Sequence, residues 1–267
     1  MAKLVLVTGA SSGIGEAAAR LYGKKGTKVL LLARNRTGLE RVAAAIREGG
    51  GAAAAYAIDL ADAAAIEETS AHIAREHGTP DILINNAGAG SWKSLVYTTA
   101  EEALAMIEVP YLAAFNLTRA FLPGMIARKS GAIACITSPA SYLVWPKATA
   151  YIAARHALAG FAEALRADLK GTGVTVTLVV LGTVETPYWD HNPGSRANVP
   201  VPNRLLAPTL SSEEAAQVIH DAVERRRRTV FKPGILRALV LLNAVAPRLV
   251  AKQLRGMLPK PDSVSGG

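Results

Sequence analysis

The stretch TGASSGIG, residues 8–15, decides the fold prediction. It stands between a short apolar run typical of a buried strand and a longer run of helix-favouring residues. Its glycines Gly9, Gly13 and Gly15 permit a tight turn and a close approach of the backbone to a ligand. The helix that follows offers free N–H groups and the positive end of its dipole to a pyrophosphate. Glycine spacing alone also fits an ordinary turn, but this strand–turn–helix context predicts a dinucleotide site.

The same alternation of strand and helix continues along the chain. The predicted strands are residues 3–8, 28–33, 52–59, 81–85, 131–138, 174–181 and 229–233. The predicted helices are residues 13–25, 37–48, 62–77, 100–128, 148–170 and 212–225. Near-continuous apolarity within the strands indicates burial on both faces. We therefore predict an α/β fold of the Rossmann type, with a doubly wound parallel sheet of seven strands.

No linker and no repeat divides the chain. We assign residues 1–232 to one dinucleotide-binding and catalytic domain. It includes a substrate loop at about 182–210, because loops of this length in compact domains are often functional. Residues 233–267 form a basic, apolar C-terminal extension that we expect to pack on the same domain.

The composition is that of a folded protein, since half of the 267 residues are apolar and 19% are charged. Cys135 is the only cysteine, and the first residues lack the apolar core of a signal peptide. These features predict a cytoplasmic protein. Five histidines show no metal-ligand spacing, so we expect no metal site. They are residues 72, 77, 156, 191 and 220, of which His191 lies in the substrate loop.

The formal charge of +9 is concentrated near the C-terminus. Residues 225–260 contain ten Lys or Arg and no acidic residue, which leaves the rest of the chain with a net charge of −1. No aromatic residues alternate with these arginines to stack on bases, so we expect no nucleic-acid partner. The apolar run at 235–246 is too short to span a bilayer. A solvated helix end followed by an apolar packing helix is the favoured interpretation, and peripheral contact with anionic lipid is the alternative.

The end of the second predicted strand bears on the choice of dinucleotide. A site for NAD needs a carboxylate here to hold the ribose hydroxyls, but this chain has Ala33 followed by Arg34 and Arg36. An arginine without a competing acid suits a 2′-phosphate. The sequence therefore favours NADP(H), with Arg34 as the phosphate ligand; Arg36 fits a solvated turn equally well.

Three further motifs occur in a fixed order after the glycine-rich turn. They are DL (59–60), NNAG (85–88), and Ser138 thirteen residues before Tyr151. With TGASSGIG, they make residues 1 to about 232 resemble the short-chain dehydrogenase/reductase family. The resemblance implies hydride transfer between a nicotinamide and a carbonyl or alcohol. It makes Tyr151 the general acid/base and Ser138 the group that holds the substrate oxygen.

The resemblance also implies the residues that line the cofactor. They are Gly9, Ser11, Ser12, Gly13, Ile14, Gly15, Arg34, Asp59, Leu60, Asn86, Ala87, Gly88, Tyr151, Arg155, Val184 and Thr186. Asp59 and Leu60 are expected at the adenine, and Val184 and Thr186 beside the nicotinamide. Asn85 is expected to brace the sheet instead.

Two positions depart from the family pattern. Arg155 stands where a lysine usually stabilises the tyrosine phenolate and holds the nicotinamide ribose, and Pro110 stands where an asparagine usually completes a proton relay. Arginine supplies charge and donors but does not readily pass a proton. A proline inside a helix costs about 3 kcal/mol and frees the carbonyl four residues earlier, here that of Met106. Either a packed kink or a remodelled site must offset this cost.

Three hypotheses follow from these departures. The favoured one is an NADP(H)-dependent reductase or dehydrogenase, such as a ketoreductase, whose relay differs, for instance with water bridging the Met106 carbonyl to Tyr151. The second is a family member performing non-redox acid/base chemistry. The third is a catalytically silent cofactor-binding scaffold.

The substrate and the oligomeric state are less closely defined by the sequence. An apolar substrate pocket and simple packing explain the surrounding residues equally well. These residues are Pro139, Tyr142, Trp145, Tyr188 and Trp189. The resemblance implies a homodimer or homotetramer formed through the helices predicted at 100–128 and 148–170.

Overall fold

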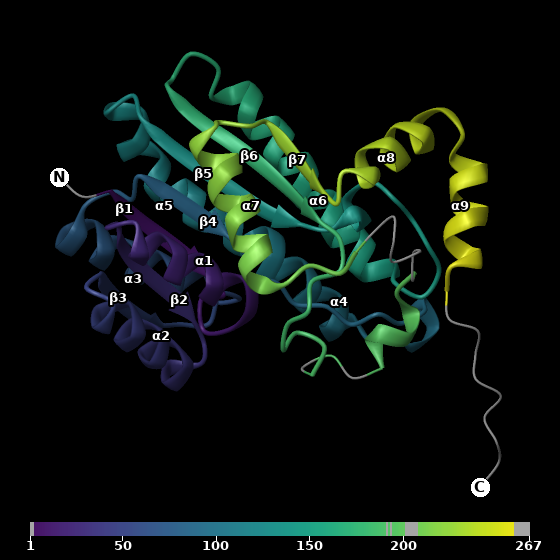
Figure 1. Ribbon diagram of the computed structural model, residues 1–267, viewed down its shortest axis with the longest axis horizontal. Coiled ribbons are helices and arrows are strands. Elements are labelled where there is room, and N and C mark those ends of the chain that lie inside the picture. Colours follow the sequence, from purple (N-terminus) through teal and green to yellow (C-terminus); the bar gives the residue numbers. More distant parts are fainter. Residues whose placement is uncertain (1–2, 191, 193, 201–207, 259–267) are drawn as a thin grey trace, which may run out of the picture.

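The computed structural model describes residues 3–190, 192, 194–200 and 208–258, which build one seven-stranded sheet (Figure 1). The strands are β1 Leu4–Thr8, β2 Lys28–Ala33, β3 Ala52–Ala57, β4 Ile82–Asn85, β5 Gly131–Thr137, β6 Val174–Leu181 and β7 Thr229–Lys232. Their order is β3-β2-β1-β4-β5-β6-β7, and every neighbouring pair is parallel. The predicted doubly wound fold is confirmed. The order reverses between β1 and β4, so a ligand crevice is expected at the carboxyl ends of these strands.

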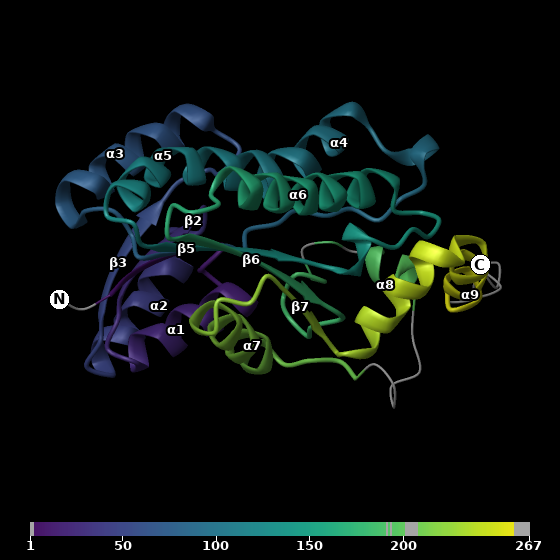
Figure 2. The same cartoon turned by 90° about the horizontal axis from the view of Figure 1, so that it is seen from above.

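Helices cover both faces of the sheet (Figure 2). The α-helices of the described chain are α1 Gly13–Lys24, α2 Arg36–Glu48, α3 Ala63–His77, α4 Ala100–Ile107, α5 Ala113–Ala127, α6 Thr149–Asp168, α7 Ser212–Glu224, α8 Ile235–Val245 and α9 Pro247–Gly256. One core cluster joins the sheet to α3, α5 and α6, and a second joins it to α1, α2 and α7. Strands buried between two helical layers need apolar side chains on both faces, which explains their continuous apolar runs.

Three strands end earlier than predicted, β7 by a single residue. β3 ends at Ala57 and β5 at Thr137, whereas the expected ends were Asp59 and Ser138. Both polar residues therefore lie just beyond the carboxyl ends of their strands. At this edge their side chains are free to contact a ligand rather than being enclosed between the sheet and a helix.

The helix predicted over 100–128 is present, but it is not a regular α-helix throughout. The chain forms α4, then a π-helical turn η2 at Glu108–Leu112, and then α5. The N–H of Ala113 donates to the carbonyl of Glu108, five residues earlier, and Pro110 lies buried inside the turn. Widening the helix by one residue removes the need for an α-helical hydrogen bond from the proline nitrogen. The π-turn is how this chain accommodates Pro110.

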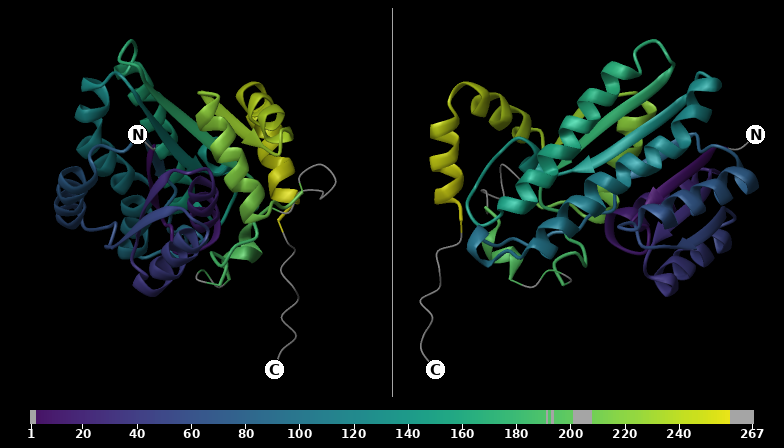
Figure 3. Two further views of the ribbon diagram at one scale, coloured as in Figure 1. Left: turned by 60° about the vertical axis from the view of Figure 1, so that its left-hand side comes forward. Right: turned by 180° about the vertical axis from the view of Figure 1, so that it is seen from behind.

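α8 and α9 stand at one end of the molecule, beyond the edge strand β7 (Figure 3). Val250 and Leu254 of α9 pack against Leu143, and Asn243 Nδ2 donates to the Tyr142 carbonyl at 3.1 Å. The C-terminal helices are thus attached to the segment between Ser138 and Tyr151. None of the helices described is long and apolar enough to cross a membrane. The domain boundary at residue 232 stays a prediction.

Candidate active site

The glycine-rich turn brings backbone rather than side chains to the carboxyl edge of the sheet. Gly9 and Gly13 have positive φ angles of 65° and 56°, which side chains rarely tolerate. A Cβ atom at Gly15 would lie 2.2 Å from the Gly9 carbonyl oxygen, so only glycine fits there. Ser12 precedes α1, and its side chain makes no capping hydrogen bond within the described part of the chain. The first N–H groups of α1 therefore face the crevice without that cap, as an anion site requires.

The NNAG loop is fastened to the end of β1. Thr8 Oγ1 accepts hydrogen bonds from the N–H groups of Asn86 and Ala87, both at 2.9 Å, and Asn86 Nδ2 donates to the Thr8 carbonyl at 3.0 Å. A Cβ at Gly9 would lie 3.0 Å from Asn86 Nδ2. The two loops are therefore in contact. The buried Asn85 instead donates to Thr118 Oγ1 at 3.4 Å and so ties β4 to α5.

The residues expected near the adenosine follow β2 and β3. Arg34 is exposed directly after β2 and pairs with no carboxylate in the described structure. Asn35 caps α2 by accepting from the Gly38 N–H at 3.0 Å. Asp59 is exposed and accepts from the Ala61 N–H at 3.0 Å, whereas Leu60 is buried. Since β2 and β3 pair in register up to Ala33, these residues lie at the same edge as the glycine-rich turn.

Ser138 and Tyr151 meet in space. Ser138 caps the 3-10 turn η3 at Pro139–Ser141, and its Oγ accepts from the Ala140 N–H at 3.2 Å. Tyr151 lies in the first turn of α6 and donates from Oη to Ser138 Oγ at 3.1 Å. The thirteen-residue spacing therefore predicts a real contact, and the hydroxyl pair lies beyond the end of β5.

Arg155 lies one helical turn after Tyr151 and is 6% exposed. Its Cζ lies 4.8 Å from the centroid of the Tyr151 ring. The guanidinium also lies against Gly88, because a Cβ there would be 2.8 Å from Nη2. The Ser141 hydroxyl, which is 2.6 Å from Thr137 Oγ1, donates to the Arg155 carbonyl at 2.9 Å and fixes this turn of α6 to β5. One cation thus contacts both the phenol and the NNAG loop.

This cation has no counter-ion within the described part of the chain. Among the described residues no carboxylate lies within 4.0 Å of Arg155, and its buried Nε has no hydrogen-bond partner. A buried charge without a carboxylate partner is costly, so the orphaned Nε is available for a ligand. The orphaned nitrogen and the tight space at Gly88 and Gly15 fit a dinucleotide whose ribose and phosphates lie along these loops.

Tyr188 adds a second phenol to the same site. A Cβ at Gly90 would lie 1.8 Å from Tyr188 Oη and 3.1 Å from the Tyr151 ring, so Gly90 makes room for both tyrosines. Burial raises the pKa of Tyr188 well above its ordinary value, the nearby Tyr151 adds to this rise, and Arg155 opposes it. Tyr188 therefore stays protonated and acts as a neutral wall of the site.

A cluster of aromatic rings adjoins Tyr151 through Trp92. The Trp92 ring lies 4.6 Å from that of Tyr151, 5.5 Å from Trp145 and 6.1 Å from Trp189. Sequence reasoning missed Trp92, whose only signal was its place four residues after the NNAG motif. Tyr142, expected in the pocket wall, packs on Phe231 of β7 instead.

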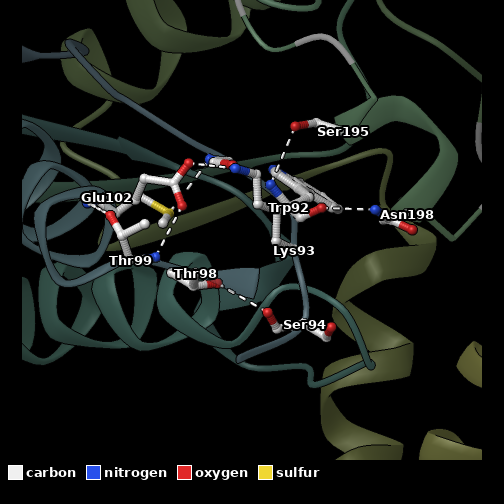
Figure 4. A network of polar contacts seen from close by, with 10 residues as sticks. Trp92, Lys93, Ser94, Thr98, Thr99, Glu102, Ser195 and Asn198 are labelled. Atoms are coloured by element: carbon white, nitrogen blue, oxygen red, sulfur yellow. Dashed lines mark hydrogen bonds and ion pairs between the residues drawn. The ribbon is translucent and has the colours of Figure 1, made fainter. Parts of the chain in front are cut away.

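The substrate loop is anchored on the chain around Trp92 (Figure 4). The Trp92 N–H donates to the buried Ser195 Oγ at 3.2 Å, and Asn198 Nδ2 donates to the Trp92 carbonyl at 2.7 Å. Lys93 pairs with Glu102, which also closes the capping box of α4. Hydrogen bonds therefore tie Trp92 to the substrate loop, and an ion pair ties the next residue, Lys93, to α4.

The start of the substrate loop reaches the glycine-rich turn. Val184 forms a parallel bridge with Leu210, and its carbonyl accepts from Trp189 Nε1 at 3.2 Å. Thr186 lies against Gly13, whose Cβ would be 3.2 Å from that of Thr186. Residues 191, 193 and 201–207, including His191, lie outside the described residues. The part described contains no cluster of metal-ligating side chains.

Buried thiol chemistry is not available in this site. Cys135 lies in the middle of β5, is fully buried, and is the only cysteine. Burial raises the pKa of Cys135 to about 12, although a hydrogen bond from Asn85 opposes the rise. Cys135 is a core residue rather than a nucleophile.

Comparisons with known proteins agree with this geometry. The family model described as "short chain dehydrogenase" matches residues 3–195. "Dehydrogenase/reductase SDR family member 7B" of Rattus norvegicus is 33% identical over 92% of this chain and 78% of its own length. "Fatty acyl-CoA reductase" of Acinetobacter baylyi is 33% identical over 92% and 80%.

A solved structure extends the likeness over nearly the whole chain. The short-chain dehydrogenase from Sphingobium yanoikuyae in complex with NADPH superposes with a TM-score of 0.80 at 26% identity, covering 97% of this chain and 99% of the other. The family model, the relatives and the parallel seven-stranded sheet agree. This chain belongs to the short-chain dehydrogenase/reductase family.

Proposed function

We propose that this protein is an NADP(H)-dependent oxidoreductase that interconverts a carbonyl compound and its alcohol. The observation that carries the proposal is the 3.1 Å hydrogen bond from Tyr151 to Ser138, beyond the carboxyl end of β5 and beside a side-chain-free glycine turn. A phenol and a hydroxyl held together can bind one carbonyl oxygen and exchange a proton with it. When bound, NADP(H) supplies or accepts the hydride.

The cofactor residues are assigned by their place along the crevice. The pyrophosphate is held by the turn that contains Gly9, Ser11, Ser12, Gly13, Ile14 and Gly15. Arg34 binds the 2′-phosphate, because it is exposed after β2 and forms no ion pair with a carboxylate of the described residues. Asp59 and Leu60 lie at the adenine. The nicotinamide and its ribose are lined by Asn86, Ala87, Gly88, Tyr151, Arg155, Val184 and Thr186.

The chain's own residues divide the chemistry among them. Ser138 holds the substrate oxygen, and Tyr151 gives the proton to the alkoxide or takes it from the alcohol. Arg155 favours the phenolate form of Tyr151 by its charge and points donors toward the ribose hydroxyls. Because a guanidinium does not readily release a proton, Arg155 acts as a fixed charge, and the proton is exchanged with water by another route.

The pocket favours an apolar substrate. Trp92 packs on Tyr151, Trp145 and Trp189 pack on Trp92, and Tyr188 is a neutral wall. Aromatic walls with a few placed polar groups are typical of sites for apolar small molecules. The relative named as a fatty acyl-CoA reductase is consistent with such a substrate. We propose aldehydes and ketones with a large apolar substituent.

We also propose a homodimer or homotetramer, in a reducing cytoplasmic compartment. Tyr111, Phe115 and Phe161 form an aromatic group across η2, α5 and α6, and Phe115 is 41% exposed. Exposed aromatic clusters are typical of interfaces. Light scattering at micromolar concentration tests the assembly, and a monomer would contradict it.

The test of the activity is NADPH consumption over a panel of apolar aldehydes and ketones. Tyr151→Phe removes the acid/base hydroxyl and should lower kcat by about 1,000-fold. NADPH binding, followed by fluorescence, should stay within about threefold of wild type, because the ring remains in place. Tyr97→Phe, at a 75% exposed position, is the matched control and should retain full activity.

The same assay separates the proposal from its alternatives. NADPH binding without consumption of any carbonyl would favour a silent scaffold or non-redox chemistry. If the wild-type protein neither binds nor consumes NADPH, the cofactor assignment itself is contradicted.

A further inference from the structure

α8 is apolar on both of its sides, but the protein covers only one of them. Leu236 is buried and Leu239 and Val240 are half-buried against the body of the protein. On the opposite side, Leu241 is 61% exposed and Val245 81% exposed. Apart from Arg237 and Asn243, α8 is apolar, and an apolar helix face is normally covered by protein or by lipid.

The uncovered residues of α8 form one stripe. Ala238, Leu241, Leu242 and Val245 are spaced i, i+3, i+4 and i+7, which places them on one face of the helix. All four are exposed. We name these four residues the apolar stripe. The sequence favoured a packing helix here, whereas the structure leaves this face open.

The next helix carries a row of cations. Arg248, Lys252 and Arg255 in α9 are spaced i, i+4 and i+7 and therefore share one face. All three are exposed, and in the described part of the chain none lies within 4.0 Å of a carboxylate. We name them the cationic row. Exposed Leu249 lies in the same helix.

The charged residues of this end are all basic. α8 and α9 contain four Lys or Arg and no acidic residue. Figures 1 and 3 place α8 and α9 together at one end of the molecule. An apolar stripe beside unpaired cations is complementary to a surface that offers acyl chains and phosphates together.

Other occupants fit this end less well. A second copy docked by the same face would bring the cationic rows of both copies together, because a two-fold interface is self-complementary. Nucleic acid would leave the apolar stripe in water, and residues 235–258 contain no aromatic side chain to stack on bases. α8 has 11 residues and is too short to span a bilayer.

We propose that α8 and α9 dock this protein on the surface of a bilayer that contains anionic phospholipid. The apolar stripe enters the boundary of the acyl chains, and the cationic row contacts the lipid phosphates. The helices of the docking surface are attached to the active-site segment, because α9 packs on Leu143, which lies between Ser138 and Tyr151 in the sequence. The docking itself does not depend on the proposed activity.

The test is co-sedimentation of the full chain with phosphatidylcholine vesicles, with and without phosphatidylglycerol. The protein should bind the anionic vesicles and bind pure phosphatidylcholine at least about tenfold more weakly. Replacing the cationic row by R248Q, K252Q and R255Q should lower the partition coefficient by about 100-fold, since each cation near the surface contributes roughly equally. L241S with V245S should lower it by about tenfold or more.

The control variant removes the same charge elsewhere. K24Q, K25Q and K170Q change exposed lysines that precede β2 and β6, at the opposite edge of the sheet from the site, and should bind as wild type does. Thermal unfolding confirms that each variant is folded, since all the replaced side chains are exposed. Equal sedimentation with both vesicle types, or an equal loss in the control variant, would overturn the proposal. So would stripe variants that dissociate an oligomer while vesicle binding is unchanged.

Discussion

The two halves of the crevice achieve their geometry in different ways. In the glycine-rich turn and the NNAG loop the backbone itself is packed or bound: Gly15 leaves no space for a Cβ, and Thr8 Oγ1 accepts from two consecutive backbone N–H groups. The half around Tyr151 is shaped by side chains, and here Arg155 and Pro110 depart from the family pattern. Where backbone packs directly on backbone, as at Gly15, substitution is excluded because an added Cβ would collide. A side-chain site accepts a replacement that keeps the charge and the contact.

Removing the cation should give the largest effect that sharpens this comparison. Arg155→Met keeps the apolar stem but removes the charge beside the phenol, and we expect kcat for carbonyl reduction to fall by about 100-fold or more. Methionine suits a buried position, so the thermal unfolding midpoint should not fall. Arg155→Lys restores a cation and should recover kcat to within about tenfold of wild type.

Two results would break this part of the account. Full activity of Arg155→Met would mean that the charge has no part in the chemistry. Activity of Arg155→Lys well above wild type would mean that arginine impairs the site rather than replacing lysine. Steady-state kinetics with NADPH in excess distinguishes the two.

A smaller effect is expected in the cofactor half. Arg34→Asp replaces the proposed phosphate ligand by a like charge, and the preference for NADPH over NADH, measured as a ratio of dissociation constants, should fall by about 10- to 100-fold. Arg36→Asp makes the same charge change at the first residue of α2 and is the matched control. An unchanged ratio in Arg34→Asp would refute the assignment.

The smallest effect is expected at Pro110. A proline straining a regular helix would cost about 3 kcal/mol, so its replacement by alanine would stabilise the protein by that amount. Because the π-turn already accommodates the ring, we expect Pro110→Ala to change the free energy of unfolding by less than about 1 kcal/mol. Leu117→Ala, buried in α5, should lose about 2–5 kcal/mol and shows that denaturant titration resolves such effects. Stabilisation near 3 kcal/mol would contradict this interpretation of the turn.

The sheet was predictable from the sequence because its information is local. β1 is buried at all five positions, and an apolar run of that kind predicts a strand that is covered on both faces. The proximity of Ser138 and Tyr151 came from a motif, and the two residues meet at 3.1 Å. In each case a short stretch or a fixed spacing carried the prediction.

What escaped prediction depends on contacts between distant residues. Pro110 signalled a conflict, but the choice of a π-turn over a kink depends on the packing around it. Trp92 reaches Tyr151 and Trp189 only after the chain has folded. The apolar pattern of α8 does not predict which of its faces the rest of the protein covers. The exposed face that contains Leu241 is evident only from the structure.

The central claim is that Tyr151 and Ser138 support hydride transfer despite the altered cation. The most direct measurement follows deuterium from C4-deuterated NADPH into the alcohol formed from an apolar ketone or aldehyde. The account predicts deuterium at the carbinol carbon, with transfer in Tyr151→Phe about 1,000-fold slower than in wild type. Tight NADPH binding with no deuterium in any product, or equally fast transfer in the phenylalanine variant, would contradict it.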